Sequence, residues 1–229
     1  MITQTRKVTL MRKIKLYALS IGLLCSLPAN ASDWLYAGVG FGMTATKAES
    51  SYQTAANRFE HYTTSDNANN YGVFIGYHYS LKETPLFVRL ELGAQSHPSE
   101  TSHEDTSYSV FTQNLASLRT NSSLLGLFKM GVSIKDLMFY GTVGVSKTNW
   151  KINIDTKDIA TTVTKNSLNS TKYGRVFGFG AEYKVNQNWA IGLDHTYTEF
   201  AALKLTVPAG NVKMEPKIHT TTFRLTYVF

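Results

Sequence analysis

The alternation of apolar with small or polar side chains, every second residue, is the feature that most constrains this chain. Residues that alternate in this way lie on opposite faces of a β-strand. Helical periodicity is weak, so strands are favoured over helices. The alternation recurs in eight segments of about ten residues, and the sequence therefore predicts an all-β domain. The segments are residues 35–43, 71–79, 86–95, 124–132, 137–146, 177–185, 189–197 and 222–229.

The less apolar face of these segments separates two architectures. A soluble barrel or sandwich buries its apolar face, whereas a membrane barrel turns that face to lipid and fills its lumen with polar or small side chains. Here the less apolar face combines glycines with isolated charges, and aromatic residues gather near the segment ends, as membrane interfaces require. Both features favour the membrane barrel. The charges expected in the lumen are Arg89, Glu91, Lys129, Glu182, Asp194 and Arg224.

The connections between the segments alternate in length. Three are short, and they lie at residues 80–85, 133–136 and 186–188. Four are long and polar, and they lie at about 46–70, 97–117, 148–171 and 198–216. A barrel inserted from one side of a membrane has short turns on the periplasmic side and long loops outside. The sequence thus predicts an eight-stranded antiparallel up-and-down transmembrane β-barrel with four surface loops and both termini on the periplasmic side.

The first 31 residues have the parts of a secretory signal peptide. Five cations and no acid precede an apolar stretch at residues 16–24, and Ala29-Asn30-Ala31 is a small-x-small cleavage pattern. Met11 is an alternative start, because the residues after it already form a basic segment. A lipid-modified Cys25 is less favoured, since Leu24 stands where such sites need a small residue. We therefore expect a cleaved signal peptide at 1–31 and a barrel domain at 32–229.

The composition excludes several other classes. Removing residues 1–31 takes away five of the 23 cations and none of the 16 acids, so the formal net charge falls from +7 to +2. No basic stripe remains to bind nucleic acid. Cys25 is the only cysteine, which rules out an intrachain disulfide framework. A content of 12% aromatic and 17% charged residues is not that of a disordered chain.

The chain resembles the small eight-stranded outer-membrane barrels of Gram-negative bacteria: the OmpA transmembrane domain, OmpX and the opacity-type surface antigens. The resemblance is most specific at Val176-Phe-Gly-Phe-Gly-Ala-Glu-Tyr183 and the segment after it. It implies a location in the cell outer membrane, a lumen role for Glu182, and exchangeable ion pairs. Gly192 stands where the family has a lumen Arg, so Arg89, Lys129 or Arg224 must supply the partner of Glu182.

The last segment resembles the family's C-terminal signal for the barrel-assembly machinery. That signal consists of alternating aromatic or apolar residues and a final Phe. Its expected members here are Phe223, Leu225, Tyr227 and Phe229. The resemblance therefore implies the barrel-assembly machinery and the outer-membrane lipid, including lipopolysaccharide, as partners of a monomeric barrel.

The sequence gives only weak signals of catalytic, metal or cofactor sites. A lipid A deacylase pattern would place Ser two residues after His195, where Tyr197 stands. His97 and His103 lie near acids in a predicted loop, but such loops are usually only solvated, and we expect no metal and no cofactor. Gly38-Val-Gly-Phe-Gly42 lacks the spacing and the helix of a dinucleotide site. We therefore expect a protein that is not an enzyme.

The expected function is structural or interactive. Eight strands enclose an interior just wide enough for side chains, and buried charges are costly unless they are paired. The long loops would carry any binding to host or matrix molecules, in adhesion or in evasion of host defences. A narrow porin-like channel is one alternative, and a lipid A-modifying enzyme is the other.

Overall fold

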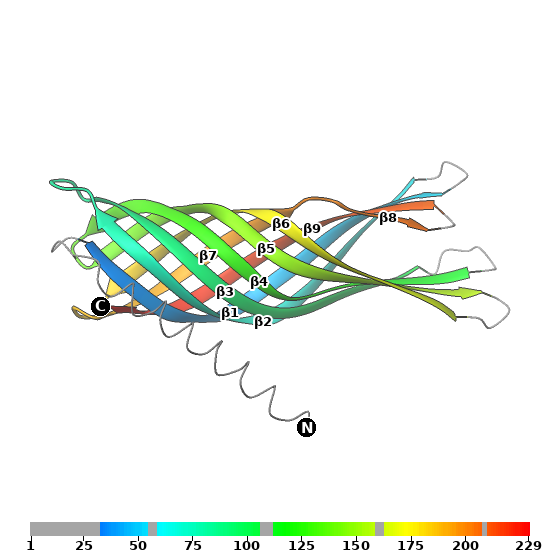
Figure 1. Ribbon diagram of the computed structural model, residues 1–229, viewed down its shortest axis with the longest axis horizontal. Coiled ribbons are helices and arrows are strands. Elements are labelled where there is room, and N and C mark those ends of the chain that lie inside the picture. The colour runs from blue at the N-terminus through cyan, green and yellow to red at the C-terminus, as the bar shows by residue number, and fades with distance from the viewer. Residues whose placement is uncertain (1–32, 55–58, 106–111, 159–162, 208–209) are drawn as a thin grey trace, which may run out of the picture. The chain divides into compact units, whose positions relative to one another are not determined.

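The computed structural model describes residues 33–54, 59–105, 112–158, 163–207 and 210–229. In these ranges the chain forms nine strand segments in antiparallel order (Figure 1). Seven of them run for 19 to 23 residues. The strands are β1 (Asp33–Thr54), β2 (Phe59–Ser80), β3 (Leu86–Asp105), β4 (Thr112–Ile134), β5 (Leu137–Asp158), β6 (Val163–Lys184), β7 (Trp189–Phe200), β8 (Leu203–Val207) and β9 (Gly210–Val228).

The sheet closes on itself through its first and last strands. β9 pairs with β7 along its C-terminal part and with β1 on its other side, where Val39 lies opposite Leu225. β8 pairs only with the N-terminal part of β9, so β7 and β8 act as one barrel strand interrupted at Ala201-Ala202. The predicted closed eight-stranded antiparallel barrel is therefore confirmed.

The three short connections lie where the alternation predicted them. In two of them a non-glycine residue adopts a positive φ angle, 61° at Glu83 and 56° at Lys135. Such angles belong to the left-handed region that tight turns use. In the third, the side chain of Asn186 accepts hydrogen bonds from the backbone N–H groups of Asn188 and Trp189, at 2.9 and 2.8 Å.

The four long connections were predicted as loops, and this prediction is wrong for most of their length. β1 continues to Thr54 and β5 to Asp158, well beyond the ten residues that a tilted strand needs to cross a bilayer. The backbone ladder of the hairpins continues beyond the belt, because pairing satisfies backbone N–H and C=O groups that would otherwise need other partners. Local register shifts accompany the extension in β3–β4 between Ser96 and Ser99, and in β4–β5 between Thr120 and Ser123.

The outer face of the strands is apolar near the tight turns and polar further along, and the inner face changes in the opposite sense. Near the tight turns, apolar side chains point outward, and Leu90, Leu92 and Phe179 are 63%, 67% and 66% exposed. We call this part of the wall the membrane belt. Beyond it, Lys47 and Glu49 are exposed while Ala48 between them is buried. We call this second part the extension, and it comprises the described residues within 47–69, 97–121, 149–171 and 198–219.

The segment before the barrel lies outside the described residues. The predicted signal peptide at 1–31 is therefore not described, and the prediction stands as it is. The barrel itself, Trp34–Phe229, forms one compact unit. Within the described ranges, no helix is long and apolar enough to cross a membrane.

Candidate functional site

Four charged side chains form a closed ring inside the membrane belt. Lys129 of β4 places its Nζ atom 3.2 Å from Glu91 of β3 and 2.9 Å from Asp194 of β7. Arg224 of β9 contacts the same two carboxylates, each at 2.6 Å. Cations and anions thus alternate around the ring. Four strands from different parts of the wall meet in it, because their inward positions fall at the same level of the barrel.

A fifth and a sixth charge lie beside this ring. Arg89 of β3 donates to Glu182 of β6 at 2.9 Å, and both side chains are fully buried. The Nε atom of Arg89 also donates to Nδ1 of His78 at 2.9 Å, and Thr226 donates to Glu182 at 3.2 Å. Arg89 therefore supplies the partner that Glu182 lacks at Gly192, which is its cross-strand neighbour.

The structure brings all six predicted lumen charges together. We call Arg89, Glu91, Lys129, Glu182, Asp194 and Arg224 the ion network. It contains three cations and three anions, and every member is buried. Burying a charge costs several kcal/mol unless partners compensate it, and here each carboxylate has at least one cationic partner. The arrangement is chemically a closed set of ion pairs. Its functional role stays a prediction.

Sequence reasoning missed two tyrosines that complete the network. Tyr36 of β1 donates to Glu91 at 3.0 Å, and Tyr140 of β5 donates to Asp194. Glycine makes room for both rings: a side chain at Gly76 would meet the ring of Tyr36, and one at Gly180 would meet that of Tyr140. Their positions in the inward phase of the alternation were the available signal.

Aromatic rings close the barrel at the level of the tight turns. His78 stacks between Trp34 and Phe87, with ring centroids 4.1 and 4.9 Å away. The guanidinium of Arg89 lies 5.0 Å from the Trp34 ring centroid and 5.2 Å from that of Phe87. Such cation–π contacts stabilise a desolvated guanidinium. The end of the lumen beside the turns is therefore filled by side chains.

Hydroxyl and amide groups occupy the interior on the other side of the ion network. Asn70 donates to Thr44 at 3.3 Å, and the hydroxyls of Thr44 and Thr220 lie 3.1 Å apart. His97 lies 2.7 Å from Ser123. His97 was predicted to belong to a solvated loop, and this is wrong: it is buried inside the barrel, because β3 extends past it and turns it inward.

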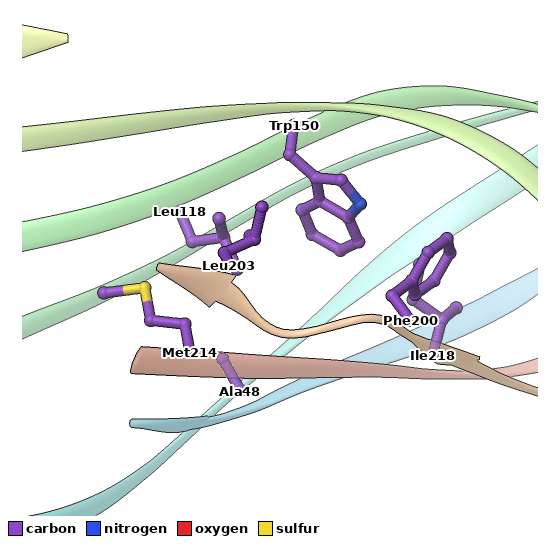
Figure 2. Packing of buried hydrophobic residues seen from close by; sticks show 7 residues of the cluster. All are labelled: Ala48, Leu118, Trp150, Phe200, Leu203, Met214 and Ile218. Atoms are coloured by element: carbon purple, nitrogen blue, oxygen red, sulfur yellow. The ribbon is translucent and has the colours of Figure 1, made fainter. Parts of the chain in front are cut away.

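An apolar cluster fills the interior of the extension. Figure 2 shows its large members, Trp150 of β5 and Phe200 of β7, whose rings meet edge to face at 5.2 Å. All members are buried, and none was predicted as core: five fall in segments expected to be loops, and Leu118 and Ile218 lie just beyond such segments. The cluster consists of Ala48, Leu118, Trp150, Phe200, Leu203, Met214 and Ile218. The described interior is thus filled in successive aromatic, ionic, hydroxyl and apolar layers.

The four residues of the predicted assembly signal lie on the outer surface of β9 or directly after it. Phe223, Leu225 and Phe229 are exposed by 39%, 37% and 63%. Tyr227 packs edge to face against Trp189 at 5.0 Å. Their apolar faces extend the membrane belt to the end of the chain. Recognition by the assembly machinery stays a prediction.

The remaining candidate residues for catalysis or metal binding are His195 and His103. His195 lies on the outer surface, with Nδ1 3.0 Å from the hydroxyl of Thr221. No cluster of three or more metal-ligating side chains occurs within the described ranges. The side chain of His103 lies outside the described part of the structure.

Comparison with known proteins agrees with this architecture. A model of the family described as "Outer membrane protein beta-barrel domain" matches residues 16–229. The 31 kDa outer-membrane immunogenic proteins of Brucella melitensis and Brucella suis are each 35% identical over 95 residues, which is 41% of this chain and 39% of each relative. The matched stretch thus spans about two fifths of these curated relatives.

Solved structures with a similar course of the chain include OprG from Pseudomonas aeruginosa. It is 14% identical, with a TM-score of 0.49, over 86% of this chain and 96% of its own. The outer membrane protease OmpT from Escherichia coli is 10% identical, with a TM-score of 0.46, over 89% and 99%. Ail from Yersinia pestis is 13% identical, with a TM-score of 0.29, over 81% and 97%. At these values none of them carries an argument about ligands or activity.

Proposed function

The chain belongs to the outer membrane protein beta-barrel domain family, and from this premise we propose that it is a sealed scaffold for contacts at the cell surface. It is an outer-membrane β-barrel protein of the Gram-negative type, related to an outer-membrane immunogenic protein. The proposed role is adhesion to host or matrix molecules, or evasion of host defences, without catalysis. The observation that carries the proposal is the contrast between a filled interior and long, polar, outward-facing hairpins.

The filled interior supports a role other than transport. The ion network joins β3, β4, β6, β7 and β9 across the lumen. A solute that passed through would have to separate Arg224 from Glu91 and Asp194, which would leave buried charges without partners. The aromatic layer of Trp34, His78 and Phe87 lies on the same path. These contacts favour a structural role for the interior.

The extension supports a role in surface contact. Its hairpins continue beyond the membrane belt as paired strands, and their outer faces carry charges such as Arg119, Lys151 and Glu199. The apolar cluster inside holds these faces in place. Residues that are presented on a rigid scaffold lose little conformational freedom when they bind a partner. A rigid, charged outer surface therefore suits recognition of a macromolecule.

Shortening the hairpins tests the proposal. Asn153 and Ser167 face each other across β5 and β6, so residues 154–166 can be replaced by Asn-Gly, which favours a tight hairpin turn. Ser102 and Ser117 allow the same change in β3–β4. Attachment of expressing cells to host-cell monolayers and their survival in serum are then measured. A shift in gel mobility on heating confirms that each barrel is folded.

The proposal expects at least one shortened variant to reduce attachment or survival threefold or more. Two outcomes contradict it. One is that wild-type cells attach and survive no better than cells without the protein. The other is that a variant with both hairpins shortened, folded and present in equal amount, matches the wild type.

The two alternatives make different demands. A narrow channel requires a steady open level in single-channel recordings of the purified barrel in a planar bilayer, which the paired interior disfavours. A lipid A-modifying enzyme requires the mass spectra of lipid A to differ between a deletion strain and its parent. If the spectra differ, the outward His195 and the neighbouring Thr221 are the first residues to test for catalysis.

A further inference from the structure

A groove crosses the outer surface of the barrel where the membrane belt meets the extension. Its volume is about 670 Å³, and residues of β2 to β6 line it. We call it the rim groove. Its apolar side includes Val73 and Leu124, which are 59% and 58% exposed. Its polar side includes Lys147, Asn149 and Ser122. The rim groove therefore joins a lipid-facing surface to a set of polar groups.

The hollow follows from small side chains beside two irregularities in the sheet. Ala94 and Ser122 line the groove, the register shift of β3–β4 begins directly after the pair Ser96–Ser122, and Ser122 lies within the register shift of β4–β5. The second shift leaves two consecutive residues, Asn121 and Ser122, exposed on the same strand. Bulges re-aim side chains and bend the strand that contains them. The surface is thus hollowed by the backbone itself as well as by small side chains.

The polar side of the groove presents hydrogen-bond donors. Thr171 donates to Oδ1 of Asn149 at 2.8 Å, so the amide nitrogen of Asn149, which lines the groove, is a further donor. Lys147 is exposed and makes no ion pair with any described residue. Among the described lining residues there is no carboxylate. A ligand group that accepts hydrogen bonds and carries negative charge fits this lining.

A second cation lies beside the groove. Lys147 of β5 is opposite Tyr173 of β6, so Arg175, two residues further along β6, is its diagonal neighbour on the same face. Arg175 itself lies opposite Glu199 of β7. The carboxylate of Glu100, on the extension above, is held by Arg119 at 2.6 Å. Within the groove the cation Lys147, unpaired among the described residues, therefore favours an anion, and the apolar belt directly below favours acyl chains.

We propose that the rim groove binds an outer-leaflet glycolipid through a phosphate group. The phosphate lies against Lys147, Asn149 and Ser122, and the acyl chains lie along Leu124 and Val73. Tyr71 and Tyr173 flank the site at the level where aromatic residues mark a membrane interface. The proposal does not depend on what the hairpins recognise, so it can fail without affecting the surface-contact role.

Native mass spectrometry of the folded full barrel in a neutral detergent tests this assignment. The protein is titrated with lipid A, a bisphosphorylated glycolipid, and with the same lipid after its phosphates are removed. Lys147→Gln removes the cation of the groove. Ala94→Trp fills the groove without a change of charge. Lys151→Gln is the matched control, because Lys151 is an exposed cation on the same strand that does not line the groove. Heat-modifiable gel mobility confirms folding.

The expected result is that Lys147→Gln and Ala94→Trp each weaken lipid A binding fivefold or more, while Lys151→Gln changes it less than twofold. The dephosphorylated lipid should bind the wild type no better than lipid A binds Lys147→Gln. Equal losses for Lys147→Gln and Lys151→Gln would indicate diffuse charge attraction and would overturn the proposal. Binding unaffected by either groove variant would also overturn it. Displacement of lipid A by inorganic phosphate at equal concentration would indicate a site for the head group alone and would overturn the lipid assignment.

Discussion

The membrane belt and the extension are built from the same strands, yet they have opposite inner and outer faces. In the belt, Leu92 points outward with 67% of its surface exposed while its neighbour Glu91 is buried. In the extension, Arg119 is exposed and its neighbour Leu118 is 3% exposed. The belt interior is held by ion pairs, and the extension interior is held by packed apolar side chains.

This difference shows that the surroundings, and not the barrel fold, decide which face is apolar. Where acyl chains surround the wall, outward apolar residues cost nothing, and the lumen accepts charges only as a closed set. Where water surrounds the wall, the hydrophobic effect again drives apolar side chains inward. In the extension the described pairing of β2 with β3 stops at Tyr71 and that of β6 with β7 stops at Gly174, so the wall divides into two groups of strands with apolar side chains between them, as in a small soluble sandwich (Figure 1).

The largest effect is expected from opening the ion network. Arg224→Met removes the partner that Glu91 and Asp194 share on β9, and leaves more negative than positive charge buried. We expect a loss of about 3 to 5 kcal/mol in the free energy of unfolding, measured by urea titration in lipid vesicles. Arg175→Met is the control, since it removes an exposed Arg, and a change of similar size there would contradict the role of the network.

The apolar cluster should respond nearly as strongly. Trp150→Ala removes the largest buried side chain of the extension and leaves a cavity beside Phe200. We expect a loss of about 3 kcal/mol and faster protease cleavage of the extension in intact cells. If Trp150→Ala is as stable as the wild type and as resistant to protease, the extension is not held by this cluster.

A charge placed on the outer face should separate the two regions. Leu92→Arg puts a charge on the belt, where it faces acyl chains, and we expect it to cost about 2 kcal/mol in vesicles. A Lys placed at Asn149, at the start of the extension, should cost less than about 0.5 kcal/mol, as surface changes usually do. Equal losses in the free energy of unfolding for the two variants would mean that the outer faces of the belt and the extension have the same surroundings.

The smallest effect is expected from an ion pair on the surface of the extension. Glu100 and Arg119 lie 2.6 Å apart, but about half of each side chain is exposed. Water and salt screen such pairs, so Glu100→Gln should change the free energy of unfolding by less than about 0.5 kcal/mol. A loss comparable to that of Arg224→Met would mean that burial does not determine how much an ion pair contributes to the free energy of unfolding.

The belt could be predicted from the sequence because its alternation is regular and its inward charges stand out among glycines. Arg89 and Glu182 were expected in one network on that basis, and they are partners. The pairing itself could not be predicted, since it depends on strand tilt and register, which place β3 opposite β6 across the lumen. Tyr36 and Tyr140 lie in the inward phase of the alternation, but the carboxylates that their hydroxyls reach depend on the same tilt and register.

The extension was misinterpreted as loops for a physical reason. Its segments are rich in Thr, Ser, Asn and Lys, which is typical of loops, and its apolar residues are widely spaced. Trp150 stands between Asn149 and Lys151, and Ala48 stands between Lys47 and Glu49. These short alternations carried the signal of a strand with an apolar inner face. They were overlooked because the inward residues of the belt are polar, so the same pattern has the opposite meaning there.

Tryptophan fluorescence in bilayers with brominated acyl chains tests the exchange of faces most directly. The chain has three tryptophans, and two double variants isolate one each: Trp34→Phe with Trp150→Phe leaves Trp189, and Trp34→Phe with Trp189→Phe leaves Trp150. Trp189 is 42% exposed at the edge of the belt, whereas Trp150 is 1% exposed inside the extension. The account predicts strong quenching of Trp189 and little quenching of Trp150. Strong quenching of Trp150 together with an unaffected Trp189 would contradict it.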